Sequence, residues 1–319
     1  MYSYPSNYNK NFNPSGLPYS VMLPETLDFQ TRMTAGGGNL LTDTELNAIN
    51  YWIGQYKYYK LWDKMVAAYP LVGGRGTTGS KNSFKINLVS SLYGITYGAG
   101  VLESMCNLTG FKNTGAIANG SNTWLDSGIS QGTLINLNPA QSLGMSCYVR
   151  THEAKSSTSQ GCTDMGCIID GTYSSVLDLT ALSVWFNPVN NVMGGSFANY
   201  AAPADLGVSV PNVMITGFYS MSYADSQSTL FKDGSLRGSS RNKSNTITPM
   251  TAKNIFLGSS VLTTTNNPVN FSNRGYGSFY IHKAYTPDEE KQRAIIEQNF
   301  QNMLGRAITI GGFETVITR

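Results

Sequence analysis

The chain has 319 residues, enough to bury the core of one large domain or of two, and its formal net charge is +3. Only 13% of the residues are charged, against roughly 25% in ordinary globular proteins. A net charge this small argues against a nucleic-acid-binding surface. Abundant Gly, Ser, Thr and Asn favour many short strands joined by polar turns over a helical bundle.

Residues 1–26 are predicted to form an extended N-terminal arm, because they are rich in Tyr, Asn and Pro and show no periodicity that could build a core. We expect the arm to order on a partner through the large faces of Tyr2, Tyr4, Tyr8 and Tyr19. A terminal tail without a role is the alternative. The arm lacks the features of a secretory signal, and no apolar run of the chain is long enough to span a membrane, so we expect no membrane insertion.

Residues 27–75 are predicted to form a small helical segment. A first short helix ends at the three glycines of 36–38. Thr42, followed by Glu45 three positions later, forms a capping box that opens a second helix. A third short helix is predicted over 58–65.

The glycine-rich stretch at 73–81 superficially resembles a phosphate-binding loop. It lacks the preceding strand and the Gly-Lys-Ser/Thr order of that motif. We interpret it as a flexible linker between the helices and the domain that follows.

Residues 76–306 are predicted to form an antiparallel jelly-roll sandwich, so that the fold class is mainly β. Asp233-Gly234 lies between two short strands and is a hairpin signal. The predicted strands are 84–89, 92–97, 131–137, 146–151, 177–186, 213–220, 228–238 and 254–258.

A C-terminal helix is predicted over 287–304, and it closes this domain. Thr286 and Glu289 form a second capping box, and Pro287 occupies the first helical position, where its missing N–H costs nothing. We expect this helix to pack outside the sandwich, against the helices of 42–69, and a tail to follow over 307–319. Its predicted apolar face comprises Ile295, Ile296, Asn299, Met303 and Leu304.

Five motifs resemble a recurring protein family of phage genomes. They are YYKLWDKMVAAYPLVGG (58–74), SNTWLDSG (121–128), LFKDGSL (230–236), NIFLG (254–258) and YIHKAYTPDEE…FQNMLGR (280–306). The first and last motifs are specific together, whereas the middle three are generic for lectin-like sandwiches. The arm and the tail lie outside the shared pattern.

The resemblance implies a small helical segment followed by a concanavalin A-like, LamG-type jelly roll. It also implies a virion protein found in tails, fibres or capsid decorations of bacteriophages, including crAss-like phages of gut Bacteroidetes. Such a protein would be assembled in the host cytoplasm, would have other virion proteins and copies of itself as partners, and could display the jelly roll toward a host-surface carbohydrate.

Catalysis finds little support in the motifs. Jelly-roll glucanases place two carboxylates on one strand as Glu-x-Asp-x-Glu, and that pattern is absent. A Gly-x-Ser-x-Gly elbow is absent as well. The sequence therefore predicts that the chain is not an enzyme, with a polysaccharide-acting glycoside hydrolase or a secreted adhesin as the alternative.

Four cysteines and two histidines are too few and too scattered for a zinc site. We expect reduced, buried thiols and no bridge between Cys162 and Cys167, because disulfides seldom persist in a reducing cytosol. Calcium sites are common in relatives of this fold, but isolated Asp and Asn residues locate none here. No other cofactor is expected.

Two groups of residues are candidates for sugar binding. Trp124 lies beside Asp126, and this pair combines an aromatic face for stacking with a hydrogen-bond acceptor. A loop carrying Arg237, Arg241 and Lys243 could meet an anionic glycan. Packing of the tryptophan at a strand end is the competing interpretation.

Overall fold

The computed structural model describes most of the chain between residue 21 and residue 306. The four arm tyrosines, Lys243 and the predicted tail over 307–319 lie outside the described residues. The described ranges are 21–112, 123–137, 142–152, 162–167, 183–187, 192–196, 208–211, 216–225, 227–241, 254–261, 268–269, 271–272 and 274–306.

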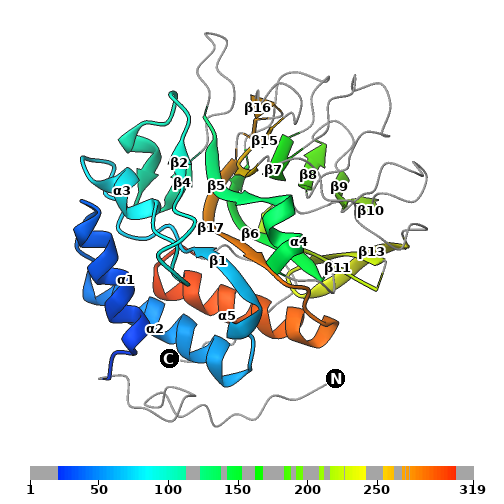
Figure 1. Cartoon of the computed structure of the whole chain (residues 1–319), viewed down its shortest axis with the longest axis horizontal. Helices are drawn as coiled ribbons and strands as arrows, with labels where there is room; N and C mark the ends of the chain where they lie inside the picture. The colour runs from blue at the N-terminus through cyan, green and yellow to red at the C-terminus, as the bar shows by residue number, and fades with distance from the viewer. Residues whose placement is uncertain are drawn as a thin grey trace.

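Two antiparallel sheets face each other and form a sandwich (Figure 1), as the mainly β fold class predicted. The helix-side sheet consists of β13 (Ser235–Arg241), β12 (Gln227–Lys232), β11 (Gly217–Ala224), β6 (Leu143–His152), β17 (Arg274–His282), β4 (Gly110–Lys112) and β3 (Cys106–Asn107), with β1 (Met65–Tyr69) also paired to β17. The distal sheet consists of β10 (Val208–Pro211), β9 (Val192–Ser196), β8 (Ser183–Asn187), β7 (Cys162–Gly166), β14 (Asn254–Leu257), β5 (Leu125–Ser130) and β2 (Thr96–Tyr97). A separate ribbon pairs β15 (Ser260–Val261) with β16 (Pro268–Val269).

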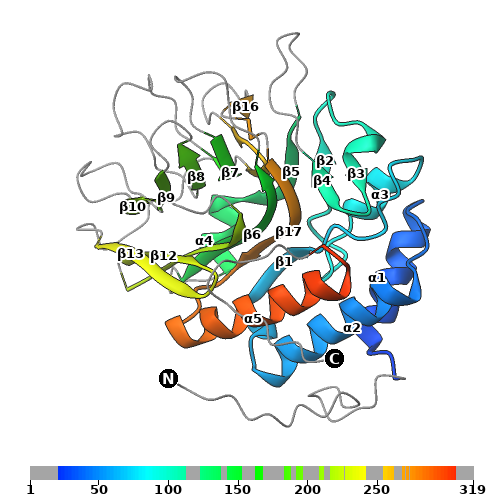
Figure 2. The same cartoon turned by 180° about the vertical axis from the view of Figure 1, so that it is seen from behind.

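Helices cover the outer face of the helix-side sheet. The long ones are α1 (Pro24–Ala35), α2 (Asp43–Tyr58) and α5 (Pro287–Met303), and α2 and α5 lie side by side below β1 (Figure 2). This arrangement confirms the predicted packing of the C-terminal helix against the helices of 42–69. The shorter helical pieces are η1 (Trp62–Lys64), α3 (Ser80–Phe84), η2 (Glu103–Met105) and α4 (Gln131–Leu137).

Local signals that the sequence carries are confirmed at three places. The capping boxes of Thr42 with Glu45 and of Thr286 with Glu289 are both formed, with each hydroxyl accepting from the backbone N–H of the glutamate. Asp233 and Gly234 form the tip of the β12–β13 hairpin and both have positive φ, at 50° and 74°. Positive φ at both central residues is what a two-residue type I′ turn requires.

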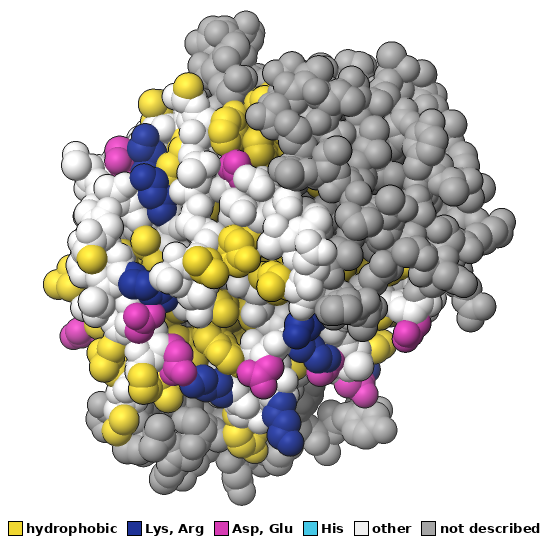
Figure 3. All heavy atoms as spheres, in the orientation of Figure 1, with side chains coloured by type: hydrophobic (Ala, Val, Ile, Leu, Met, Phe, Trp, Pro, Cys, Tyr) yellow, Lys and Arg dark blue, Asp and Glu magenta, His cyan; other side chains and the backbone are white. Residues whose placement is uncertain are grey.

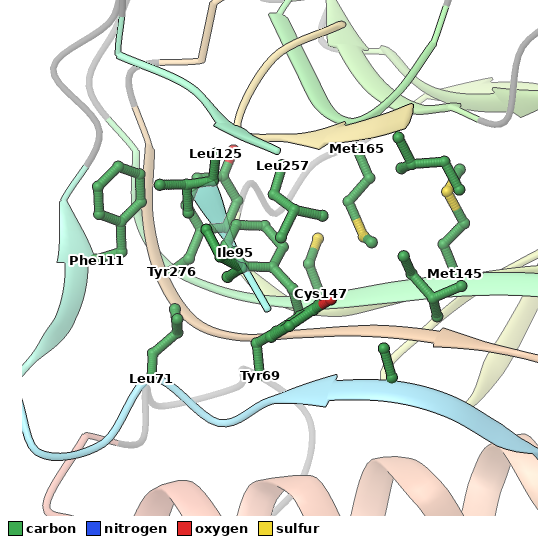
Figure 4. Close-up of a cluster of buried hydrophobic side chains, with 14 of the residues drawn as sticks. Tyr69, Leu71, Ile95, Phe111, Leu125, Met145, Cys147, Met165, Leu257 and Tyr276 are labelled. Carbon is green, nitrogen blue, oxygen red and sulfur yellow. The ribbon is translucent and has the colours of Figure 1, made fainter. Parts of the chain in front are cut away.

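The main core lies between the two sheets, where side chains from both inner faces interdigitate (Figure 4). Along β11, Tyr219, Met221 and Tyr223 point into this core. The alternate residues Phe218 and Ser220 point toward the helices and are also buried. Both faces of the central strands are therefore covered, and all nine residues of β17 are buried.

The prediction of a helix over 58–65 is wrong. Only the 3₁₀ turn η1 forms there, and the chain then enters β1, which pairs with β17. Its pairing partners in β17 lie more than 200 residues away in sequence, so the local sequence pattern does not predict this strand. Because β1 belongs to the sandwich, the residues of 27–75 contribute a strand as well as helices.

Three predicted strands are also wrong in whole or in part. Residues 131–137 form α4, because Ser130 Oγ accepts a hydrogen bond from the backbone N–H of Thr133 at 3.0 Å and caps a helix. The stretch at 84–89 is not a strand, and that at 92–97 pairs only at its last two residues. Short apolar runs do not distinguish a strand from a helix or a buried turn.

The stretch at 73–81 is held in place, so its interpretation as a flexible linker is wrong. The backbone N–H of Gly73 donates to Glu45 Oε1 at 2.8 Å, and Arg75 forms an ion pair with Glu45 Oε2 at 2.5 Å. Ser80 Oγ accepts from the backbone N–H groups of Arg75 and Thr77. These bonds tie the stretch to the start of α2.

Candidate functional site

The outer face of the distal sheet carries a small aromatic platform. Ile255 and Leu257 of β14 point into the core, so Phe256 between them points to the opposite face. There its ring stacks on Trp124, with 4.6 Å between the ring centroids and an interplanar angle of 12°. Phe256 is 4% exposed, whereas Trp124 is only partly buried. The prediction that the tryptophan packs at a strand end is therefore confirmed, and part of it still reaches the surface.

A carboxylate and an amide flank this platform. Asp126 lies directly opposite Phe256 in the β5–β14 ladder and opposite the exposed Thr96 in the β2–β5 ladder. Its Oδ2 accepts from Asn254 Nδ2 at 3.1 Å, and its Oδ1 accepts from the backbone N–H of Gly128 at 2.8 Å. These bonds fix the carboxylate on the same face as the aromatic stack.

Hydrophobic and acidic side chains are exposed over the upper part of β5 in the view of Figure 3. The face combines a flat apolar surface with fixed polar groups, and recognition sites for small ligands generally use this combination. We call the surface formed by Thr96, Trp124, Asp126, Asn254 and Phe256 the distal-face patch.

Among the sequence-predicted ligand residues that the structure describes, Trp124 and Asp126 lie together. Arg237 is exposed on β13, in the other sheet, and Arg241 ends that strand, so the predicted loop is a strand as far as residue 241. Whether any of these residues binds a ligand stays a prediction.

Sequence reasoning missed three members of the patch: Thr96, Asn254 and Phe256. Each lies in a stretch that the sequence predicts as a strand, but only the cross-strand register brings all three beside β5. The NIFLG motif did mark the strand of Asn254 and Phe256, but no local signal showed which of its faces points outward.

A second polar cluster lies buried between the sheets. Asp164 of β7 forms an ion pair with Arg274 of β17 at 2.5 Å, and Tyr276 Oη donates to Asp164 Oδ1 at 2.5 Å. Burial raises the pKa of the Asp164 carboxyl, against the opposing influence of Arg274 and Tyr276. Both charged side chains are almost completely buried, so the pair links the two sheets without reaching the surface.

A third cluster connects α5 to the helix-side sheet. Arg293 contacts Glu290 at 2.9 Å and donates to Ser146 Oγ at 2.6 Å, while Ser220 Oγ donates to Glu290 Oε1 at 2.7 Å. One turn further along α5, Glu297 accepts hydrogen bonds from four donors. These donors are Trp52 Nε1, Ser278 Oγ, Tyr280 Oη and Gln301 Nε2.

The predicted apolar face of α5 is thus right only in part. Ile296 is buried, but Asn299 donates to Tyr51 Oη, and the face that contacts the sheet carries charged side chains. Serines of the central strands supply hydroxyl partners for these charges. Because those groups are enclosed, the cluster stabilises the fold and leaves no open cleft around them.

Burial disfavours the thiolate form of two described cysteines, Cys106 and Cys147. Burial raises the pKa of Cys106 to about 12 and holds that of Cys147 well above its usual value. The Cys162–Cys167 expectation stays a prediction, because the side chain of Cys162 lies outside the described residues. Among the described residues, no group of three or more His, Cys, Asp or Glu side chains could hold a metal ion, and no helix is long and apolar enough to cross a membrane.

No protein-family model and no curated protein matches this chain. Among solved structures, the CBM40 module of the Ruminococcus gnavus IT-sialidase bound to α2,3-sialyllactose matches 63% of this chain and 97% of its own, with 11% identity and a TM-score of 0.41. A Trypanosoma rangeli sialidase mutant displaying trans-sialidase activity matches 83% of this chain and 40% of its own, with 12% identity and a TM-score of 0.48. The Streptococcus pneumoniae NanB sialidase matches 51% of this chain and 25% of its own, with 11% identity and a TM-score of 0.39.

The sequence-based exclusion of enzymatic activity is wrong, because sialidases occur among these matched structures. The exclusion rested on the absence of a paired-carboxylate motif. Sialidases are an exception to that chemistry, since their nucleophile is a tyrosine. At such identities and TM-scores the likeness assigns neither an activity nor a ligand to this chain.

Proposed function

We propose that this chain is a structural protein of a bacteriophage virion, acting as a fibre, tail or capsid-decorating component. It displays a lectin-like sandwich on a helical base, and it attaches to a host-surface glycan through the distal-face patch. The base comprises α1, α2, α5 and β1.

The observation that carries this proposal is that two segments contact each other in the structure. They are the two motifs with the most specific resemblance to the phage family, 58–74 and 280–306. Arg306 closes the second motif, and its guanidinium donates to the carbonyl oxygens of Leu71 at 2.9 Å and Pro70 at 3.1 Å in the first. The side chain is buried, and burial lowers its pKa to about 10. The arginine is therefore a fixed link between the motifs.

Two further contacts join the same motifs. Lys64 forms an ion pair with Glu289 at 2.6 Å, and Tyr285 Oη donates to the carbonyl oxygen of Leu61 at 2.8 Å. Residues on which the resemblance rests thus hold the β1 and α5 regions of the base together. This supports a family resemblance that extends to the architecture.

The base and the distal-face patch lie on opposite sides of the molecule, because the helices cover one sheet and the patch belongs to the other. The described chain begins on the base, where Asn50 accepts from the backbone N–H of Leu23 at 2.7 Å and donates to the carbonyl oxygen of Val21. Attachment to the particle through the N-terminal arm would leave the distal face free for a glycan.

The proposal is tested on purified phage particles. We expect the protein at a fixed stoichiometry in gradient-purified virions. A chain lacking residues 1–20 should fold normally, since it keeps the contact of Leu23 with Asn50, but it should fail to incorporate. Removal of residues 307–319 is the matched control.

Absence of the full-length protein from particles would contradict the virion role. Normal incorporation of the 1–20 truncation would contradict the role of the arm. Release of reducing sugar from host polysaccharide by the purified protein would instead support the hydrolase. Light scattering of the purified chain tests the expected homo-oligomer.

A further inference from the structure

We infer that the distal-face patch takes an uncharged pyranose glycan and discriminates against sialylated or otherwise anionic sugars. This inference rests on the proposed glycan attachment and adds the chemical class of the ligand. It is carried by the geometry of the aromatic stack and by the sign of the charge beside it.

The aromatic stack supplies the apolar half of such a site. Trp124 packs one ring face on Phe256 and keeps part of its surface accessible. A large ring held flat by a second ring is a rigid contact surface that needs little further ordering on binding. The C–H face of a pyranose is apolar and of similar size, so stacking buries apolar area on both partners.

Asp126 supplies the polar half of the site. Each of its oxygens accepts one hydrogen bond within the protein, and a carboxylate oxygen has two acceptor sites. The group can therefore accept two further hydrogen bonds from sugar hydroxyls, and bonds to a charged acceptor are stronger than neutral ones. Asn254 Nδ2 donates to Oδ2 and orients it. Thr96 lies exposed on the other side of Asp126.

Among the described residues, the cations nearest to this patch lie on other faces of the molecule. Lys81 and Lys85 lie over the ring of Tyr97, at 5.8 and 5.7 Å from its centroid. Tyr97 pairs with Leu125, whose side chain points into the core, so both lysines approach the opposite side of β2 from Thr96. Arg237 belongs to the other sheet. In the part of the chain that the structure describes, the charge fixed beside the stack is thus the negative one of Asp126, and it repels a sugar carboxylate or sulfate.

The test compares two probes that differ only in the acidic sugar, lactose and 3′-sialyllactose, and extends to an array of matched neutral and sialylated oligosaccharides. We expect binding to neutral members and at least about tenfold weaker binding to their sialylated partners. Trp124→Ala should weaken neutral binding by about tenfold or more. Asp126→Asn, which keeps the shape, should weaken it by about tenfold and reduce the discrimination between the two probes.

Arg237→Ala is the matched control, because it removes an exposed side chain of the other sheet and should leave neutral binding unchanged. Trp124→Phe keeps an aromatic ring on Phe256 and should lose less affinity than Trp124→Ala. Unfolding midpoints of all variants separate a binding defect from a folding defect.

Preferential binding of sialylated glycans, or neutral binding that Asp126→Asn and Trp124→Ala leave unchanged, would overturn the inference while glycan attachment stands. No binding to any glycan, with the protein present in virions, would overturn both the inference and the attachment step but not the virion role.

Discussion

The buried ion pair of α5 offers the sharpest test of how the base is held to the sandwich. Glu290 and Arg293 are fully buried, and burial raises the pKa of Glu290 against the opposing influence of Arg293. Replacing Arg293 with Met removes the cation and preserves much of the volume. The carboxylate then keeps only the hydroxyls of Ser220 and Ser222, at 2.7 and 3.2 Å.

Removing one partner of a buried pair typically costs about 3–5 kcal/mol, because the remaining charge loses its compensation. Taking about 4 kcal/mol and a urea m-value of about 3 kcal/mol/M, Arg293→Met should lower the unfolding midpoint by roughly 1.3 M. The double variant Glu290→Gln/Arg293→Met removes both charges and should cost less than the sum of the two single changes. A coupling of about 2 kcal/mol or more is expected from a double-mutant cycle.

The chain provides a matched control on the same helix. Asp288 and Lys291 form an ion pair with the same sequence spacing at 3.2 Å, but their side chains are 93% and 65% exposed. Lys291→Met should therefore change the free energy of unfolding by less than about 1 kcal/mol. If Arg293→Met costs no more than Lys291→Met, or if the cycle is additive, the reasoning about the buried pair fails.

Three further predictions concern stability in urea unfolding. Gly234→Ala should lower the free energy of unfolding by about 2–3 kcal/mol, because φ is +74° and the new Cβ would lie 2.7 Å from Lys291 Cα. Gly305→Ala is the control: φ is +65° but the space around the new Cβ is open, so it should cost about 1 kcal/mol. Equal costs for the two variants would contradict this prediction. Arg306→Lys should lower the free energy of unfolding by about 3 kcal/mol, since one ammonium cannot reach all three carbonyl oxygens that the guanidinium contacts. A loss of stability below about 1 kcal/mol would refute this reasoning. Burial, reinforced by neighbouring cations, lowers the pKa of His282. The contribution of the neutral imidazole to the free energy of unfolding is therefore present above the unfolded pKa of about 6.5 and is lost below it, by up to about 1.4 kcal/mol per pH unit. His282→Gln should remove this slope of stability against pH between about pH 7.5 and 5.5.

Features that depend on neighbouring residues could be predicted from the sequence. The capping box of Thr286 and Glu289, the tight turn at Asp233-Gly234 and the β-rich composition each act over a few residues, and each was found in the structure. In the candidate site, Trp124 and Asp126 were recognisable because they lie two positions apart in the sequence.

Features that depend on distant partners were decided only by the tertiary structure. Met65–Tyr69 forms a strand because β17 is there to pair with it, although the local pattern favours a helix. The sequence around Glu290 and Arg293 does not indicate that they are buried; in the structure they are enclosed, and serines of β6 and β11 complete their hydrogen bonds. Phe256 and Asn254 joined the distal-face patch through cross-strand register, which depends on contacts far apart in sequence, so the ligand face could not be assembled from the sequence alone.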